Sequence, residues 1–394
     1  MKNQSKLEQQ VQRWTAAGVI DQTSAGRILA FEAGQDRRAS LRWPVILAMI
    51  FGGLLLAAGI TLFVAAHWAE ISPSERFALM IVMVGVFHVG GALVADRFPV
   101  LSTTLHAIGT VTLGAAIFLT AQIFNLHENW ATGVLLWATG AAIGFALLRD
   151  WVQAAALALL APAWLISQWS ITMEAHRGGK QPIEVGLLLL SLTYLSARIG
   201  DQESTARRAL VWVGGIALLP CAGLAIALAM ADFDNFNLPG MRPSQIGFAP
   251  LAIAWTIAII GPLLLAWFLR GRAVWMNAAW AAWSCALVFT AAHSHRYPLY
   301  GGSRNLVAIL ALYGYCALGS VALVAWGLYE RRKERLNLGI VAMAISVLFF
   351  YFDGFMGKLG RSASLLILGA LCLAGGYALE ITRRRLVARM EASR

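Results

Sequence analysis

The stretch VILAMIFGGLLLAAGITLFVAAHWAEISPSER, residues 45–76, decides the class of fold. Residues 45–66 hold no charged side chain, and a helix of about 20 apolar residues crosses the roughly 30 Å hydrocarbon layer of a membrane. The apolar run stops at His67 and Trp68 and resumes at Phe77. We interpret the stretch as a membrane-spanning helix that ends with a ring at headgroup depth, followed by a short turn into a second helix.

The turn itself has two interpretations. Ser72 or Ser74 is suited to cap the second helix, and Pro73 or Glu75 to occupy its first turn. His67 keeps open the alternative of a chemical site at the membrane surface. We take the turn as an interfacial connection first and as a proton or metal site second.

Composition places the whole chain in the membrane class. Of its 394 residues, 59% are hydrophobic and 13% are charged, whereas a soluble domain is about half apolar and about a quarter charged. The net charge of +11 would suggest nucleic acid in a soluble chain, but anionic lipids at the cytoplasmic face of a membrane attract the same residues. The expected partners are the bilayer and those lipids, with no nucleic acid.

Residues 1–42 are polar and predict a cytoplasmic helical hairpin without a cleavable signal peptide. Gly18 is placed to end the first helix and Asp21 to cap the second. The apolar face of the first helix is formed by Leu7, Val11 and Trp14. So short a segment buries little core alone, so we expect it to dock on the membrane domain, on another copy or on a protein partner.

Hydropathy predicts an all-α polytopic bundle over residues 43–380, with a basic cytoplasmic tail at 381–394. About twelve spans are expected: 45–66, 77–95, 101–123, 131–148, 151–173, 183–198, 209–230, 247–269, 273–292, 305–328, 337–352 and 363–379.

The distribution of basic residues predicts the orientation. With both termini in the cytoplasm, about 23 of the 31 Lys and Arg residues fall on the cytoplasmic side, as the positive-inside rule requires. The sequence therefore predicts a multi-pass membrane protein with both termini in the cytoplasm.

Small residues and prolines within the spans indicate how the helices pack. Gly140 and Gly144 have the GxxxG spacing, and glycine pairs occur at 52–53, 90–91, 214–215 and 375–376. Such residues let helix backbones approach closely. Prolines at positions 162, 220, 250 and 262 predict kinks, or broken helices that line a transport site. The four cysteines lie in four different apolar runs, which argues against a disulfide framework.

Ionisable groups at membrane depth are the usual sign of a transport pathway, and the central thirds of the predicted spans hold no Asp, Glu, Lys or Arg. The polar residues that remain include His88, His106, Asn277, Gln122 and Asn125. Four of them are our candidates for substrate binding: Gln122, Asn125, His88 and His106. Hydrogen bonding between helices is the alternative.

Histidines collect on the predicted outer side. His67, His127, His293 and His295 form a candidate proton or metal patch, in which HSHRY at 293–297 brings two imidazoles to one metal if it is extended. Solvated loops are the alternative. No cofactor is expected, and the nucleotide, zinc-protease and hydrolase motifs are missing, which disfavours an enzyme.

Four segments carry a resemblance to a known family: VQRWTAAGVIDQTSAGRIL (11–29), FVAAHWAEISPSERF (63–77), GAAIFLTAQIFNLHENW (114–130) and YFDGFMGKLGRSASLLILGALCLAGGYALEITRRRL (351–386). The chain resembles the bacterial membrane proteins grouped as domain of unknown function 2157. In that family the first helix ends in Ala-x-x-Trp, matched by Ala65 to Trp68, and the third in Ala-Gln-Ile-aromatic, matched by Ala121 to Phe124. The resemblance implies a membrane fold located in a bacterial inner membrane and no particular chemistry.

About twelve helices with little extramembrane mass favour a transporter or channel for a small or lipidic solute, by analogy of fold. One alternative is a non-catalytic envelope scaffold that recruits a partner. Another is an intramembrane enzyme that acts on a lipid-linked substrate.

Overall fold

The computed structural model describes residues 11–29, 55, 71–125, 129–173, 176–177, 179–198, 204–230, 244–245, 247–296, 306–354 and 361–392. The chain divides into two compact units, residues 1–76 and 77–394. Apart from Leu55, the predicted first span at 45–66 lies outside the described residues, and so does the segment Ala65 to Trp68.

In the first unit, the described part of the N-terminal segment contains two short helices, at residues 11–16 and 22–29. Gly18 follows the first helix with φ of 67°, a left-handed conformation that glycine adopts without steric cost. Asp21 Oδ2 accepts hydrogen bonds from the backbone N–H groups of Thr23 and Ser24 at 3.2 and 3.3 Å. The predicted helix end and helix cap are therefore confirmed.

Helix α4 (Pro73–Val94) begins directly after the turn that opened the sequence analysis. Ser72 Oγ accepts from the backbone N–H of Glu75 at 3.4 Å, and Glu75 Oε2 accepts from the Ser72 backbone N–H at 2.9 Å. These reciprocal bonds form a capping box. Ser72 is thus the cap, and Pro73 and Glu75 occupy the first turn as expected.

The described part of the second unit is a series of α-helices, which confirms the all-α fold class. After α4 come α5 (Pro99–Ile123), α6 (Trp130–Leu148), α7 (Trp151–Met173), α8 (Gln181–Leu195), α9 (Thr205–Met230), α10 (Phe248–Arg270), α11 (Trp275–Arg296), α12 (Leu306–Tyr329), α13 (Lys333–Gly354) and α14 (Arg361–Ala392). A 3-10 helix, η2 (Gly271–Val274), joins α10 to α11. Two-residue strands β1 (His176–Arg177) and β2 (Ser244–Gln245) pair in parallel.

The number of membrane spans differs from the prediction. In the part of the chain that the structure describes, eight stretches are long and apolar enough to cross a membrane. One of them, Phe248–Ala292, has 45 residues and contains α10 and most of α11. Helix α8 has only 15 residues and α14 is not among the eight. Every predicted span after the first coincides with a helix, but the total of about twelve spans is not confirmed.

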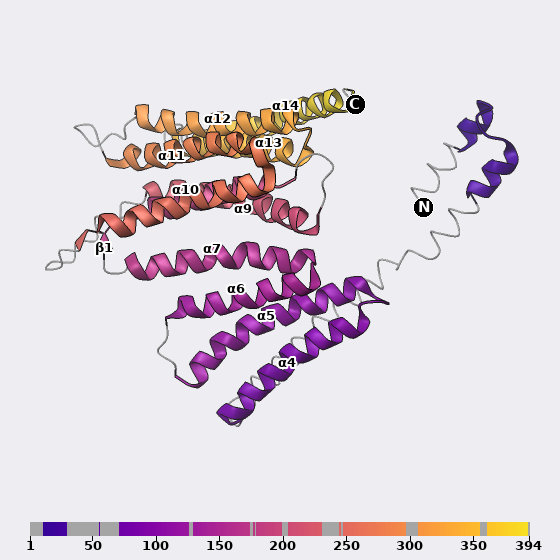
Figure 1. Ribbon diagram of the computed structural model, residues 1–394. Coiled ribbons are helices and arrows are strands. Elements are labelled where there is room, and N and C mark those ends of the chain that lie inside the picture. The colour runs from indigo at the N-terminus through magenta and orange to yellow at the C-terminus, as the bar shows by residue number, and fades with distance from the viewer. Residues whose placement is uncertain are drawn as a thin grey trace. The chain divides into compact units, whose positions relative to one another are not determined.

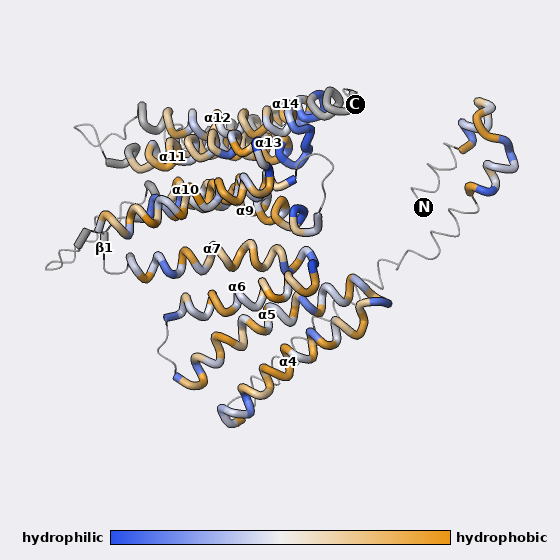
Figure 2. The backbone as a smooth tube through the Cα atoms, in the orientation of Figure 1, coloured by the Kyte–Doolittle hydropathy of each residue, from blue (hydrophilic) through white to orange (hydrophobic). Residues whose placement is uncertain are grey.

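Helices that follow one another in the chain mostly pack together, and two that have further neighbours are α8, which contacts α9, α10 and α11, and α9, which contacts α7, α8, α11 and α13. The connections α4–α5, α6–α7, α10–α11 and α12–α13 all lie at one end of the helices (Figure 1). We call this the basic end, because its turns carry Arg97, Arg149, Arg272, Arg331 and Arg332. Figure 2 shows hydrophobic residues along the helices and hydrophilic residues gathered towards their ends.

Most of the core surrounds α8. Leu188, Leu189, Leu192 and Leu195 are each at most 2% exposed, and they form one cluster with residues of α9, α11 and α12. By contrast, many large side chains on the outer helices are exposed, for example Leu93 at 81% and Phe268 at 74%. Apolar side chains that point outward are expected where the surrounding solvent is lipid.

Glycines bring the backbones of neighbouring helices together, as the sequence predicted. A Cβ atom on Gly214 of α9 would stand 2.5 Å from the backbone N of Leu195 and from the backbone O of Ser191, both on α8. On α12, a Cβ atom at Gly327 would lie 2.6 Å from Leu336 N of α13. Gly375 and Gly376 have no described atom within 4 Å of that position. Close packing is therefore confirmed for Gly214 and not found for the last pair.

We predict that Gly214→Ala destabilises the protein by about 1–3 kcal/mol, the usual cost of overpacking, because the atoms it meets are backbone atoms of α8 that have no rotamer to change. Gly223→Ala is the matched control on the same helix, since no atom lies within 4 Å of its Cβ position. Thermal unfolding of both variants in detergent micelles measures the difference. Equal melting temperatures would show that α8 and α9 do not approach as closely as described.

Candidate functional site

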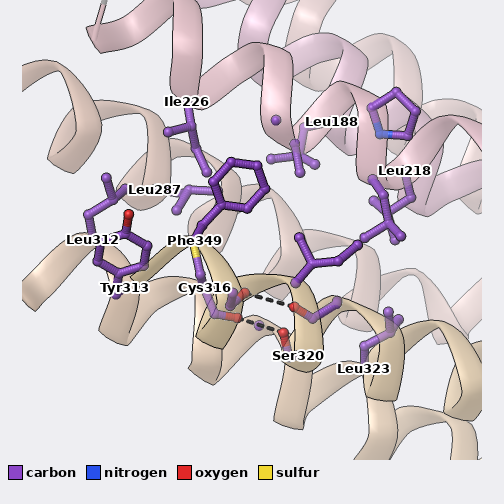
Figure 3. A pocket seen from close by; sticks show the side chains of 18 of the residues that line it. Leu188, Leu218, Ile226, Leu287, Leu312, Tyr313, Cys316, Ser320, Leu323 and Phe349 are labelled. Carbon is purple, nitrogen blue, oxygen red and sulfur yellow. Dashed lines mark hydrogen bonds between the residues drawn. The ribbon is translucent and has the colours of Figure 1, made fainter. Parts of the chain in front are cut away.

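A large cavity lies among α8, α9, α11, α12 and α13. Its volume is about 830 Å³, within the roughly 300–1,000 Å³ range of small-molecule sites. Figure 3 shows side chains from these helices that surround one space, including Leu188, Leu218, Ile226, Leu287 and Leu312. The cavity is therefore built largely from the hydrophobic faces that also make the core.

The serine hydroxyl groups in the lining are used locally. Ser320 Oγ donates to Cys316 O at 2.8 Å, and Ser346 Oγ donates to Ala342 O at 2.8 Å. Each bond stays within one helix and links residues four apart, which leaves the hydroxyl hydrogen unavailable to a ligand. This lining suits hydrocarbon better than a polar solute.

The cavity opens beside the end of α13. Phe349 and Phe352 both line it, yet they are 62% and 42% exposed. Pro220, inside α9, also lines the cavity. A proline inside a helix removes one backbone hydrogen bond and weakens the helix at that point. The kinked helix predicted at Pro220 thus borders this cavity.

A second cavity of about 260 Å³ lies between α7, α8 and α10, and it is lined by Pro162 and Pro262. Two of the predicted proline sites therefore border this smaller space. Neither cavity is lined by any of the four residues that the sequence proposed for substrate binding.

Two of those four residues lie in contact. His88 of α4 and His106 of α5 have their Nδ1 atoms 3.2 Å apart, and their ring centroids are 5.4 Å apart. His106 is 6% exposed, and His88 is half-buried. The sequence analysis proposed each residue separately as a candidate, and the packing of α4 on α5 brings the two side chains into contact.

Gln122 and Asn125 lie at the other end of α5. Both are exposed, and at 1.5 Å per residue Gln122 is about 24 Å along the helix from His106. The structure thus separates the four candidates into two groups, and their role in binding stays a prediction.

A polar network behind His106 was not found from the sequence. Gln153 of α7 is fully buried, and its Nε2 donates to Thr110 Oγ1 at 2.8 Å and to His106 O at 3.3 Å. Trp137 Nε1 donates to Thr110 O at 2.8 Å. The sequence did contain a signal for this network, because Gln153 is a polar residue at the third position of the predicted span 151–173. In the structure the network joins α5, α6 and α7.

The four histidines of the candidate proton or metal patch are not brought together among the described residues. His67 and His127 lie outside the described residues, whereas His293 and His295 lie in the last turns of α11. The metal hypothesis for HSHRY required an extended backbone, whereas residues 293–296 are helical. Among the described residues, no group of three or more His, Cys, Asp or Glu is placed to hold a metal.

Arg270 and Arg335 lie outside the predicted spans, directly after the span that ends at 269 and shortly before the one that begins at 337, but both are buried. Arg270 Nη2 lies 2.5 Å from Glu330 Oε1, and Arg335 forms a second ion pair with the same carboxylate. Trp326 Nε1 donates to Glu330 Oε1 at 2.7 Å, and the Arg335 guanidinium lies 4.3 Å from the centre of the Trp326 ring. The single carboxylate holds two arginines at the basic end.

These arginines also bind the carbonyl groups at the end of α8. Arg270 Nη1 donates to Ser196 O at 2.8 Å, and Arg335 donates to Leu195 O at 3.3 Å and to Arg198 O at 3.2 Å. Such carbonyls have no partner within the helix, and positive charge is favourable beside them. We call these arginines together with Glu330 the α8 cap.

Asn277 of α11 supports the same helix end. It is fully buried, and its Nδ2 donates to Thr193 Oγ1 at 3.3 Å and to Ser196 Oγ at 3.1 Å. Hydrogen bonding between helices, the alternative interpretation for Asn277, is therefore confirmed.

Opposing effects act on the pKa of Glu330, which follows the last residue of α12. Burial raises it, while the hydrogen bond from Arg270, the charge of Arg335 and the hydrogen bond from Trp326 lower it. The net result is a pKa below the ordinary value of 4.5. Glu330 is therefore a carboxylate at neutral pH.

Glu184, in the first turn of α8, was also missed. It is 3% exposed, and its Oε2 has no hydrogen-bond partner among the residues that the structure describes. The sequence reading considered only the central thirds of the spans and so passed over a carboxyl group near a helix end.

We predict that Glu330→Gln destabilises the protein by about 3–5 kcal/mol, because it leaves two buried guanidinium groups without their carboxylate. Glu334→Gln is the matched control: its pair with Arg198 is 3.2 Å long, but the Glu334 side chain is 48% exposed. An exposed pair is worth about 0–1 kcal/mol. Thermal unfolding in micelles compares them, and equal losses would contradict the α8 cap.

Acid should remove the same contribution. Because the folded-state pKa of Glu330 is lowered from 4.5, its stabilising effect is complete above that pH and is lost as the pH falls through the folded-state pKa. Melting temperatures of the wild type and Glu330→Gln, measured from neutral to acidic pH, should converge on acidification. A constant difference between them would contradict this expectation.

Comparison with known proteins supports the membrane assignment. A family model described as a predicted membrane protein, domain of unknown function 2157, matches residues 12–153. The match includes His88, His106, Gln122 and Asn125 and ends before the helices that form the large cavity. No curated protein and no solved structure matches the chain. Together with the apolar helices, the match supports a multi-pass membrane protein, and residues 12–153 are similar to the family of domain of unknown function 2157.

Proposed function

We propose that this protein binds the hydrocarbon part of a lipidic solute in the cavity among α8, α9, α11, α12 and α13, and that it transports this solute within the membrane. The observation that carries the proposal is the cavity of about 830 Å³ with its apolar lining. The side chains that line a void of this size lack van der Waals contacts on the side that faces it. An apolar ligand in the void would supply those contacts.

The position of the opening supports a lipidic ligand over a water-soluble one. Phe349 and Phe352 border the opening, and they belong to the predicted span 337–352. Exposed aromatic rings in such a span face hydrocarbon, so a ligand enters from the bilayer without passing through water. Binding then depends on shape and apolar contact, because the serine hydroxyls are already bonded within their helices.

The construction of α9 supports transport as well as binding. Pro220 and Gly223 both border the cavity, and no atom lies within 4 Å of a Cβ position at Gly223. A helix that lacks one backbone bond and has free space one turn later bends at low cost. Movement of this part of α9 would change the width of the cavity while the contact at Gly214 keeps the rest of the helix on α8.

A substitution that fills the cavity tests this proposal. Ala342 lines the cavity from α13, so Ala342→Trp places an indole ring in the space. Its neighbour Val341 is 46% exposed and is outside the lining, so Val341→Trp adds the same ring on another face. Both variants are reconstituted in liposomes with a phospholipid that carries a photoreactive group on its acyl chain.

Wild type and Val341→Trp should be labelled on α9, α12 and α13 and should speed the transfer of a fluorescent phospholipid between leaflets. Ala342→Trp should lower cavity labelling about tenfold, equivalent to about 1.4 kcal/mol, and should slow transfer. Equal labelling of all three proteins would refute binding in the cavity. Normal labelling with no transfer by the wild type would leave a lipid-binding protein and refute transport.

A further inference from the structure

The histidine pair of α4 and α5 has a separation that fits a hydrogen bond and also fits two ligands of one metal ion. The two Nδ1 atoms are 3.2 Å apart and face each other. Two nitrogen ligands, each about 2.0–2.1 Å from one tetrahedral metal ion, lie about 3.3 Å apart. The observed separation of 3.2 Å is thus close to that of two ligands on a shared metal ion.

Glycines fix the rings in this arrangement. A Cβ atom on Gly91 of α4 would lie 2.9 Å from Cε1 and Nε2 of His106, and one on Gly109 of α5 would lie 2.8 Å from Nε2 of His88. Each ring therefore rests with its far edge against a glycine of the opposite helix. This packing directs both Nδ1 atoms towards the space between the helices, and a larger residue at either glycine would displace a ring.

From this geometry we propose that His88 and His106 form a metal site, in which each Nδ1 donates a lone pair to one transition-metal ion of the kind that imidazole binds, Zn²⁺ or Cu⁺. Imidazole is a common ligand of both elements. Two protein ligands leave further coordination positions open for water or an exchangeable ligand. The site is separate from the hydrocarbon cavity and does not depend on its proposed function.

The depth of the pair in the helices allows an ion to reach it. His88 is six residues from the end of α4 at Val94, which is about 9 Å along the helix. His106 is seven residues from the start of α5 at Pro99. The pair therefore lies near the basic end, close to the turn between the two helices. His88 is only half-buried, so one ring of the pair is partly accessible.

The buried polar groups behind the pair hold its backbone in place. Thr110 Oγ1 donates to His106 O at 3.0 Å, and Gln153 Nε2 donates to the same oxygen at 3.3 Å. Fixed ligand positions favour metal binding, because less conformational freedom is lost when the ion binds.

The test is a titration of the full-length protein in micelles, first with Zn²⁺ and then with Cu⁺ under reducing conditions, against a competing chelator. The wild type should bind one ion of at least one metal per chain. His88→Gln and His106→Gln should each weaken binding by more than the roughly 10- to 100-fold loss typical of residues that only support a ligand. His176→Gln is the control, since His176 lies in β1 at the opposite end of the helices (Figure 1).

A measurement on the wild type alone keeps the proposal testable if a variant fails to fold. X-ray absorption of the loaded protein should show imidazole nitrogens at about 2.0–2.1 Å from zinc, or the equivalent imidazole pattern for copper. The proposal is overturned if neither metal binds with unit stoichiometry, if His88→Gln and His106→Gln bind like the control, or if the spectrum lacks imidazole ligands. In each case the pair is a hydrogen bond between helices and nothing more.

Discussion

The end of α8 is the point on which the described bundle depends. A helix that stops inside a protein must give its last carbonyl groups a partner, because an unpaired backbone group away from water costs several kcal/mol. Here Arg270 and Arg335 supply the donors for carbonyls at Leu195, Ser196 and Arg198. Glu330 in turn balances part of their charge. With this end satisfied, a helix of 15 residues can stand at the centre of longer ones.

The candidate site follows from that placement. Because α8 contacts α9, α10 and α11, one of its faces supplies Leu188 and Leu192 to the large cavity, and another supplies Gly186 and Tyr194 to the smaller one. The α8 cap is thus one of the supports of both cavities, although no residue of the cap lines either. Loss of Glu330 would disturb binding through the position of α8.

The sequence predicted the helices well because their signals are local. Each predicted span after the first coincides with a helix, and the caps at Asp21 and Ser72 were recognisable from residue type and spacing. The site could not be predicted in the same way. Glu330 meets Arg270 across 60 positions of sequence, and hydropathy left Arg335 between two predicted spans although it is 1% exposed. A void between apolar side chains leaves no trace in a hydropathy pattern.

The histidine pair could be predicted in part from the sequence. His88 and His106 were identified as unusual residues within apolar spans, but only the packing of α4 on α5, at Gly91 and Gly109, brings their Nδ1 atoms together. Gln122 was selected by the same criterion and lies on the same helix, yet it is far from the pair. Residue type therefore identified the candidates, and tertiary contact decided which of them act together.

The opening of the cavity beside Phe349 and Phe352 has a consequence for how occupancy is defined. A ligand that enters from hydrocarbon equilibrates with the membrane, so the quantity that controls occupancy is its mole fraction among the lipids and not its concentration in water. The alkyl chains of a detergent are chemically similar to such a ligand and compete for the same space. Extraction thus replaces the native occupant by mass action, and the bilayer composition becomes a variable of the binding equilibrium.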